Sequence, residues 1–163
     1  QIAIAIVGSS ARPRKNRMTF SLVRCDSDGR PEQAIASLSS ELEASCVATA
    51  ELYRRVGYVE PWVGYVTVVD GEGVGGGAFV GPPNDNCVEI AYFTLKDQER
   101  RGYASQTAAG LVEIARRAAP TLQLKAFTLM EQNASTRILQ RLGFKVIGTS
   151  QDADAGEVWE WRA

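Results

Sequence analysis

Apolar and polar residues alternate over several short segments of this chain, and such alternation is typical of β-strands. The segment 88–95, VEIAYFTL, differs because it is apolar at nearly every position, which predicts a strand buried on both faces of a sheet. Turn residues at 70–73 separate two strands and indicate a hairpin. The predicted strands are 18–25, 63–69, 75–80, 88–95, 122–129, 145–149 and 157–161.

Three other segments are rich in helix-forming residues. The segment 102–119 predicts a helix with one small apolar face, and a proline stops it. The segment 133–142 predicts a short helix, with Gly143 in the left-handed conformation that follows a helix end. The segment 31–56 is rich in Ala, Leu, Glu and Ser, and predicts two helices with a break near 44–46.

The order of these elements predicts an α/β (α+β) fold, a mixed twisted central sheet of about seven strands flanked by about four helices. The length of 163 residues fits a single domain over 1–163, in which 1–15 form an irregular or extra N-terminal segment. The longest clean apolar run, 2–7, is far shorter than the roughly 20 residues that span a bilayer, so no membrane partner is expected.

Composition excludes several kinds of site. The chain has no histidine, which excludes Ser-His-Asp and Cys-His nucleophile systems and imidazole metal sites, and no metal is expected. A net charge of −1 gives no support to a nucleic-acid partner, and none is expected. Cys25, Cys46 and Cys87 are widely spaced and contain no C-x-x-C pair, which predicts reduced thiols in a cytoplasmic protein.

The segment Gly71–Gly76, GEGVGG, matches the dinucleotide-binding pattern G-x-G-x-x-G. That pattern holds a pyrophosphate only where a helix begins at the glycines. Here a strand follows, so we interpret the segment as a hairpin turn. A dinucleotide-dependent oxidoreductase is therefore not expected.

The segment 98–105, QERRGYAS, has the context that the glycine pattern lacks, because a strand precedes it and a helix follows. The first amides of a helix have no internal partners and lie at the positive end of the helix dipole. Gly102 allows a ligand to approach the backbone, and the neighbouring Arg100 and Arg101 add positive charge. By itself this loop fits a phosphate seat and a bare connection equally well.

Three runs of the chain, VEIAYFTL, QERRGYASQTAAGLVEIA and QNASTRILQRLGF, resemble the GNAT superfamily of N-acetyltransferases in their order and spacing. The likeness covers roughly residues 62–150, and is nearest to the branch of the RimJ/RimL-type ribosomal-protein alanine N-acetyltransferases. It implies the single-domain GNAT-like acyl-CoA N-acyltransferase fold. It also implies acetyl-coenzyme A (acetyl-CoA) as the cofactor and an amine as the acceptor.

The resemblance further implies which residues would hold the cofactor. The family's Q/R-x-x-G-x-G/A loop corresponds to 99–104, where both small residues match and Glu99 departs, so we expect the Glu99 carboxylate to turn away from a pyrophosphate. Ser135 corresponds to a serine near the coenzyme thiol, although serine is also favoured in the first turn of a helix, and Asn133 is explained equally well as a helix cap. The implied cofactor-binding residues are Ala91, Tyr92, Phe93, Arg100, Arg101, Gly102, Tyr103, Ala104, Ser105, Asn133 and Ser135.

Glu89 is the predicted general base, because it is a carboxylate in an otherwise apolar strand and relatives often carry a glutamate there. The alternatives are an ion pair with an arginine or a solvated strand end. Backbone N–H groups near Ala91 and Tyr92 would polarise the thioester carbonyl. Many relatives have a tyrosine acid where this chain has Leu139; Tyr92 and Tyr103 could replace it, although both fit core or sheet positions better. The implied catalytic residues are Glu89 and Ser135.

Together these features predict an acetyl-CoA-dependent N-acetyltransferase. It would transfer an acetyl group to a primary amine, at a protein N-terminus or on a small molecule, by direct attack on the thioester. The alternative is a non-catalytic CoA-binding sensor or a protein-interaction module with the same fold, which Leu139 and Glu99 favour. The expected partners are acetyl-CoA and the amine acceptor, and the expected oligomeric state is a monomer or a homodimer.

Overall fold

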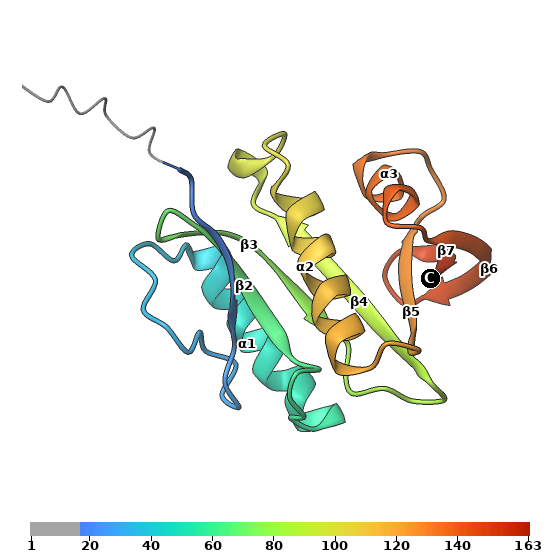
Figure 1. Cartoon of the computed structure of the whole chain (residues 1–163), viewed down its shortest axis with the longest axis horizontal. Helices are drawn as coiled ribbons and strands as arrows, with labels where there is room; N and C mark the ends of the chain where they lie inside the picture. Colours follow the sequence, from blue (N-terminus) through green and yellow to red (C-terminus); the bar gives the residue numbers. More distant parts are fainter. Residues whose placement is uncertain (1–16) are drawn as a thin grey trace, which may run out of the picture.

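The computed structural model describes residues 17–163, which form one sheet with helices on both faces (Figure 1). The strands are β1 (Phe20–Arg24), β2 (Gly64–Val69), β3 (Glu72–Phe79), β4 (Cys87–Thr94), β5 (Gln123–Leu129), β6 (Lys145–Asp152) and β7 (Gly156–Arg162). They lie in the order β1-β2-β3-β4-β5-β7-β6, and all neighbours are antiparallel except β4 and β5. The predicted mixed sheet of seven strands is confirmed. The segment 1–15, expected to be irregular or extra, lies outside the described residues.

Three α-helices and one short 3-10 helix accompany the sheet within residues 17–163. They are α1 (Ser40–Val56), η1 (Lys96–Gln98), α2 (Tyr103–Ala118) and α3 (Ala134–Arg141). The prediction of two helices over 31–56 is wrong. The Ser39 hydroxyl caps a single helix by accepting a hydrogen bond from the amide of Leu42 at 3.3 Å, and no glycine or proline interrupts the 17 residues that follow.

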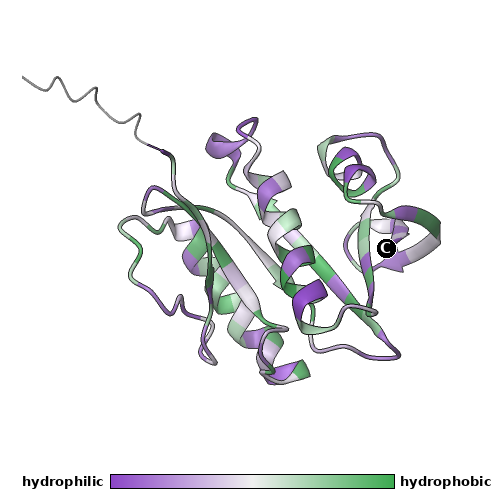
Figure 2. Ribbon diagram, in the orientation of Figure 1, coloured by the Kyte–Doolittle hydropathy of each residue, from purple (hydrophilic) through white to green (hydrophobic). Residues whose placement is uncertain are grey.

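Helices α1 and α2 cover opposite faces of the sheet (Figure 1). Val66 and Val68 of β2 pack with Leu42 of α1. Between them, the hydroxyl of Thr67 hydrogen-bonds to that of Thr107 in α2 at 2.8 Å. Because successive side chains of a strand point to opposite faces, every position of β2 is buried. The loop that leads into α2 lies outside this core and is hydrophilic (Figure 2).

Strand β4 joins the two halves of the sheet, but it pairs with β5 along only part of its length. Parallel pairing links Cys87–Glu89 to Gln123–Lys125, and in the described chain no residue of β4 beyond Glu89 pairs with β5. The first half of β4 is buried, whereas Ala91 and Phe93 are exposed. The prediction that this strand is buried on both faces is therefore wrong for its second half, where Ala91 and Phe93 line a cavity on the α1 side of the sheet. Beyond Glu89, β4 also has no pairing with β5, which leaves a gap in the sheet.

Helix α3 shares the main core with α2, because its Leu139 is fully buried in the cluster that contains Leu111. Gly143 follows this helix with φ of 87°, which is the predicted left-handed cap. None of the helices in the described part of the chain is long and apolar enough to cross a membrane. In the same residues, no group of three or more His, Cys, Asp or Glu side chains could hold a metal ion.

Candidate active site

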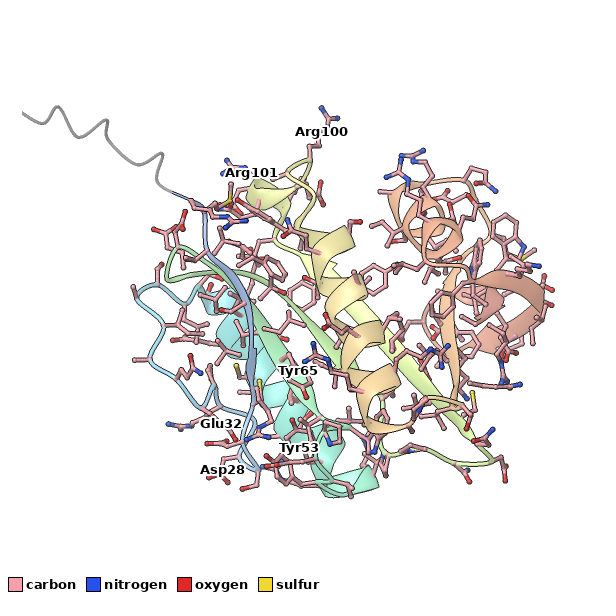
Figure 3. All side chains as sticks on the ribbon, in the orientation of Figure 1. Asp28, Glu32, Tyr53, Tyr65, Arg100 and Arg101 are labelled. Carbon is pink, nitrogen blue, oxygen red and sulfur yellow. The ribbon has the colours of Figure 1, made fainter. Side chains whose placement is uncertain are left out.

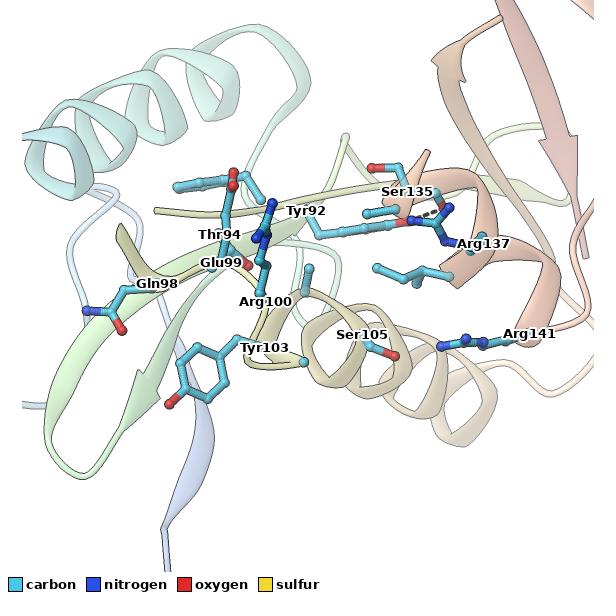
Figure 4. Close-up of a pocket in the computed structure, with 15 residues that line it drawn as sticks. Tyr92, Thr94, Gln98, Glu99, Arg100, Tyr103, Ser105, Ser135, Arg137 and Arg141 are labelled. Carbon is cyan, nitrogen blue, oxygen red and sulfur yellow. Dashed lines mark hydrogen bonds between the residues drawn. The ribbon is translucent and has the colours of Figure 1, made fainter. Parts of the chain in front are cut away.

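A pocket of about 660 Å³ lies between the loop before α2, the exposed half of β4 and helix α3 (Figure 4). Its charged lining consists of three arginines and one acidic residue, namely Arg100, Arg137, Arg141 and Glu99. Among the described residues, none of the three arginines forms a salt bridge. The pocket is therefore electropositive and suits a ligand with several negative charges.

The loop before α2 turns sharply, so that the free amides of the helix face the pocket. Arg100 and Gly102 both have left-handed backbone, with φ of 64° and 80°. Gly102 is the N-cap, and neither a side-chain cap nor an acidic residue occupies the first turn. A Cβ built at Gly102 would meet nothing within 4 Å, so the protein leaves this backbone uncovered. Ala104 and Ser105 continue the pocket wall from the first turn.

Thr94 contributes a hydroxyl without a partner to the same pocket. Its Oγ1 atom is the one buried side-chain nitrogen or oxygen in the described residues that forms no hydrogen bond. A buried polar atom left unpaired costs about 1–3 kcal/mol. Because Thr94 lines the pocket, this atom points to a ligand that supplies the missing hydrogen bond.

The backbone of β4 directs an amide into the gap beside β5. The amide of Leu95 donates to the carbonyl of Val74, and the amide of Val80 donates to the carbonyl of Glu89, both at 2.9 Å. These two bonds continue the pairing of β4 with β3 by one residue at each end. In an antiparallel pair, successive residues alternate between bonding to the partner and facing away from it. The odd-numbered residues of β4 bond to β3, and the amide of Tyr92 faces the gap.

Tyr92 and Ser135 stand at the junction of the pocket with a smaller cavity of about 120 Å³ in the gap. The Tyr92 hydroxyl donates a hydrogen bond to the Ser135 carbonyl at 3.3 Å (Figure 4). Burial raises the pKa of Tyr92 to about 12, so the phenol is protonated at neutral pH. A proton donor and a serine hydroxyl thus lie where the two cavities meet.

Glu89 lines the smaller cavity, and it is the last residue of β4 that pairs with β5. Burial raises the pKa of its carboxyl, the nearby charge of Lys125 opposes this shift, and the charges of Asp152 and Glu160 reinforce it. No arginine forms a salt bridge with Glu89 within residues 17–163. The structure therefore does not support the alternative interpretation, an ion pair between Glu89 and an arginine.

A third cavity, of about 150 Å³, opens on the α1 face of the sheet. Ser45, Cys46 and Thr49 of α1 line it on one side, and Ala91 and Phe93 of β4 line it on the other. It carries no charged side chain. Tyr92 borders all three cavities, so the second half of β4 separates an electropositive pocket from an uncharged one.

The sequence matches the family model of the acetyltransferase (GNAT) domain over residues 24–145. The chain belongs to the GNAT acetyltransferase family. Members of this family use acetyl-CoA. The fold and family expected from the three sequence runs are confirmed. No curated protein matches the sequence.

Solved GNAT structures share the fold. RimL, a ribosomal-protein α-N-acetyltransferase solved with coenzyme A in a disulfide with one of its cysteines, has a TM-score of 0.60 and 19% identity over 76% of this chain and 71% of its own. Mycobacterium smegmatis RimJ, solved with CoA-disulfide, has a TM-score of 0.57 and 18% identity over 74% of this chain and 59% of its own. A Bacillus anthracis GNAT acetyltransferase has a TM-score of 0.54 and 15% identity over 61% of this chain and 64% of its own. This chain therefore spans less than two thirds of the last two proteins.

Some residues that the GNAT resemblance implied as cofactor contacts have their side chains elsewhere. The Asn133 side chain caps α3 by accepting a hydrogen bond from the amide of Thr136 at 3.1 Å, which fits the alternative interpretation of that residue. Arg101 is exposed and does not line the pocket, although it extends from the same loop as Arg100 (Figure 3). Tyr103 is buried in the core, so its contribution to the GNAT pocket comes from its backbone.

Glu99 lines the pocket, and the expectation that its carboxylate turns away from a bound pyrophosphate stays a prediction. The departure from the family pattern is therefore part of the site. Leu139 is fully buried and lines the small cavity beside Ser135, so the place of the family's tyrosine is taken by an apolar wall. Of the two tyrosines considered as replacements, Tyr92 lies in the site, whereas the Tyr103 hydroxyl approaches the Met18 sulfur at 3.6 Å.

The sequence interpretation did not include Thr94, Arg137 and Arg141 among the site residues of this GNAT protein. The spacing of Arg137 and Arg141 held a signal, because residues four apart lie on one face of a helix. Arg137 and Arg141 are exposed, whereas Ile138 and Leu139 form the buried face of α3. Thr94 gave no sequence signal, because its unpaired hydroxyl is evident only in the packed structure.

Proposed function

We propose that this protein is an acetyl-CoA-dependent N-acetyltransferase acting on a primary amine, at a protein N-terminus or on a small molecule. The observation that carries the proposal is the gap between β4 and β5. It connects the electropositive pocket to the cavity of Glu89 through two shared residues, Tyr92 and Ser135. A phosphate seat, a proton donor and a carboxylate base are thereby arranged along one path.

The pocket has three features that suit the diphosphate of coenzyme A. Free amides from Gly102 to Ser105 supply donors at the positive end of a helix dipole. Thr94 Oγ1 offers a further polar contact, and the Arg100 guanidinium adds charge. Arg101 and Tyr103 take part through the backbone of this loop. With the diphosphate held there, Ser135 lies on the way to the gap and is the expected neighbour of the sulfur.

Bound acetyl-CoA supplies an acetyl group activated as a thioester. The amide of Tyr92 faces the gap and would stabilise negative charge on the acyl oxygen as the amine adds. The Tyr92 hydroxyl, protonated because its pKa is raised to about 12, would give a proton to the departing sulfur. Tyr92 thereby takes the role of the tyrosine that Leu139 replaces.

Glu89 would accept the proton that the amine must lose, directly or through water. A base works best when its pKa lies near the operating pH, and burial shifts the pKa of Glu89 in that direction. Deprotonating a lysine-type amine at pH 7 costs about 4.6 kcal/mol, against about 1 kcal/mol for an α-amino group. A single carboxylate base of this kind suits an α-amino acceptor better than a lysine side chain.

The uncharged cavity on the α1 face is the proposed entrance for the acceptor. It lies across β4 from the phosphate pocket, so the amine and the coenzyme would approach from opposite faces of the sheet. Direct attack requires both reactants to be bound at the same time, and two separate cavities allow this. We also propose a cytoplasmic location, supported by the free thiols of the three cysteines.

Transfer from acetyl-CoA to a panel of amines and N-terminal peptides tests the proposal, with release of free thiol as the measurement. The expected result is thiol release that depends on at least one amine and is slowed in Glu89→Gln. Matched measurements with Glu51→Gln, an exposed carboxylate on α1, control for the loss of one negative charge. Failure of the wild-type protein to bind acetyl-CoA would overturn the proposal.

A non-catalytic coenzyme sensor is the second candidate, and Leu139 and Glu99 are the observations that favour it. An apolar residue replaces the usual tyrosine, and a carboxylate stands beside the phosphate seat. A sensor would be stabilised against heat by coenzyme A and would release no thiol with any amine. The same panel of amines, run beside thermal unfolding with coenzyme A, separates the two functions.

A further inference from the structure

Helix α3 presents two arginines to the phosphate pocket at a spacing of four residues. Arg137 and Arg141 are neighbours on one face of the helix, and both line the pocket opposite Arg100 (Figure 4). Neither forms a salt bridge within the described residues. Like charges at this spacing destabilise a helix, so an anion bound between them would relieve a repulsion as well as form new bonds.

The position of the pair along α3 separates it from the gap. Ser135 lines both the pocket and the gap cavity, whereas Arg137 and Arg141 line the pocket alone. At 1.5 Å per residue, Arg141 lies about 9 Å along the helix axis from Ser135. Arg141 therefore belongs to the end of the pocket that is remote from the reacting groups, and Arg137, one turn nearer to Ser135, lies between the two.

This inference rests on the proposed function, because it concerns the second phosphate group of the same cofactor. Coenzyme A carries a diphosphate and, on its ribose, a separate 3′-phosphate. The amides of α2 suit the diphosphate, which leaves the arginine pair without a ligand. A phosphate monoester is close to doubly charged at neutral pH, and guanidinium groups bind phosphate through paired hydrogen bonds.

We propose that Arg137 and Arg141 form a subsite for the ribose 3′-phosphate, so that the protein selects coenzyme A over 3′-dephospho-coenzyme A. The residues that would recognise the 3′-phosphate lie on α3, apart from the family loop at the start of α2. Glu99, the one acidic residue of the lining, lies on that loop and not on α3. The two phosphate seats are thus carried by different elements of the fold.

The test measures the affinities of coenzyme A and 3′-dephospho-coenzyme A by titration calorimetry, for the wild type and for Arg137→Gln, Arg141→Gln and the double variant. The wild type should bind coenzyme A at least tenfold more tightly than the dephospho form. The double variant should lose roughly tenfold to a hundredfold for coenzyme A. Its affinity for the dephospho form should stay within about twofold, so that the selection disappears.

Both arginines are exposed, so these substitutions should leave the fold intact, and the thermal midpoint of each variant checks this. Arg55→Gln, an exposed arginine at the end of α1, is the matched control for lost charge and should keep the selection. Arg141→Lys should keep part of it, because the charge remains and the paired geometry is lost.

Each other outcome overturns the inference in a recognisable way. Equal binding of both coenzymes by the wild type would remove the 3′-phosphate subsite and leave the proposed transferase function standing. An equal loss for both coenzymes in the double variant would assign the arginines to the diphosphate. A wild type that binds neither coenzyme would overturn the proposed function together with the subsite.

Discussion

The hydroxyl of Tyr92 hydrogen-bonds to the backbone carbonyl of Ser135 at 3.3 Å, and this contact ties β4 to the first turn of α3. It crosses the place where β4 and β5 have separated, so it bridges a gap that the sheet itself does not close. The two residues thereby fix the junction between the phosphate pocket and the cavity of Glu89.

Tyr92→Phe should reduce kcat at least tenfold, because the variant lacks the proposed proton donor to the departing sulfur. The free energy of unfolding should fall by only about 1 kcal/mol, the usual value of one hydrogen bond. Steady-state kinetics and urea unfolding measure the two effects. An unchanged kcat would remove Tyr92 from proton transfer to the departing sulfur.

Gly102→Glu should abolish coenzyme A binding, because it places a carboxylate at the free amides of α2. Gly102→Ala is the matched control. Both substitutions impose a side chain on backbone with φ of 80°, and no neighbour lies within 4 Å of the new Cβ. Both should therefore lose a similar free energy of unfolding, about 1 kcal/mol, and the alanine variant should retain measurable affinity. Normal binding by Gly102→Glu would contradict the phosphate seat.

Thr94→Val should act in opposite directions on stability and on binding. Valine has nearly the same shape and removes the unpaired hydroxyl, so the free protein should gain about 1 kcal/mol of unfolding free energy. Coenzyme A affinity should fall, because the ligand loses a hydrogen bond. Chemical unfolding and calorimetry report the two quantities. A less stable variant with unchanged affinity would show that the hydroxyl has no ligand to bind.

Glu89→Gln should remove the acidic limb of the pH–rate profile. The base must be ionised, so wild-type kcat/KM should decrease as the pH falls through the raised pKa of Glu89. Glu89→Gln should be slow at every pH and show no such decrease, with coenzyme affinity nearly unchanged. Retention of the wild-type profile would exclude Glu89 as the base.

The same pKa shift makes a prediction for stability. Because the folded pKa of Glu89 is higher than the unfolded value of about 4.3, protonation favours the folded state. That contribution is complete below the unfolded value and is lost as the pH rises through the folded one. Glu89→Gln should therefore raise the thermal midpoint at pH 7 and leave it unchanged near pH 4, as differential scanning calorimetry would record.

The sequence predicts those parts of the fold and site that depend on local order. The turn of the loop at Gly102, the start of α2 and the cap at Gly143 all follow from short stretches of chain. The unbroken helix α1 was mispredicted because Ala44–Cys46 contains no breaker and the cap at Ser39 sets the start.

Features that depend on packing between distant segments could not be predicted in this way. Strand β4 loses its pairing with β5 after Glu89, and Ala91 and Phe93 border a cavity that α1 does not fill, although both lie in a run that looks buried. The effect of Asp152 on Glu89 requires the β6–β7 hairpin to come near β4, and these residues are far apart in sequence. The unpaired hydroxyl of Thr94 is likewise a property of the folded packing.

A crystal structure of the protein with coenzyme A bound tests the central claim most directly. The proposed function predicts the diphosphate within hydrogen-bonding distance of the amides from Gly102 to Ser105, and the sulfur beside Ser135 in the gap between β4 and β5. A diphosphate bound away from the first turn of α2, or a sulfur that does not reach the gap, would contradict the account.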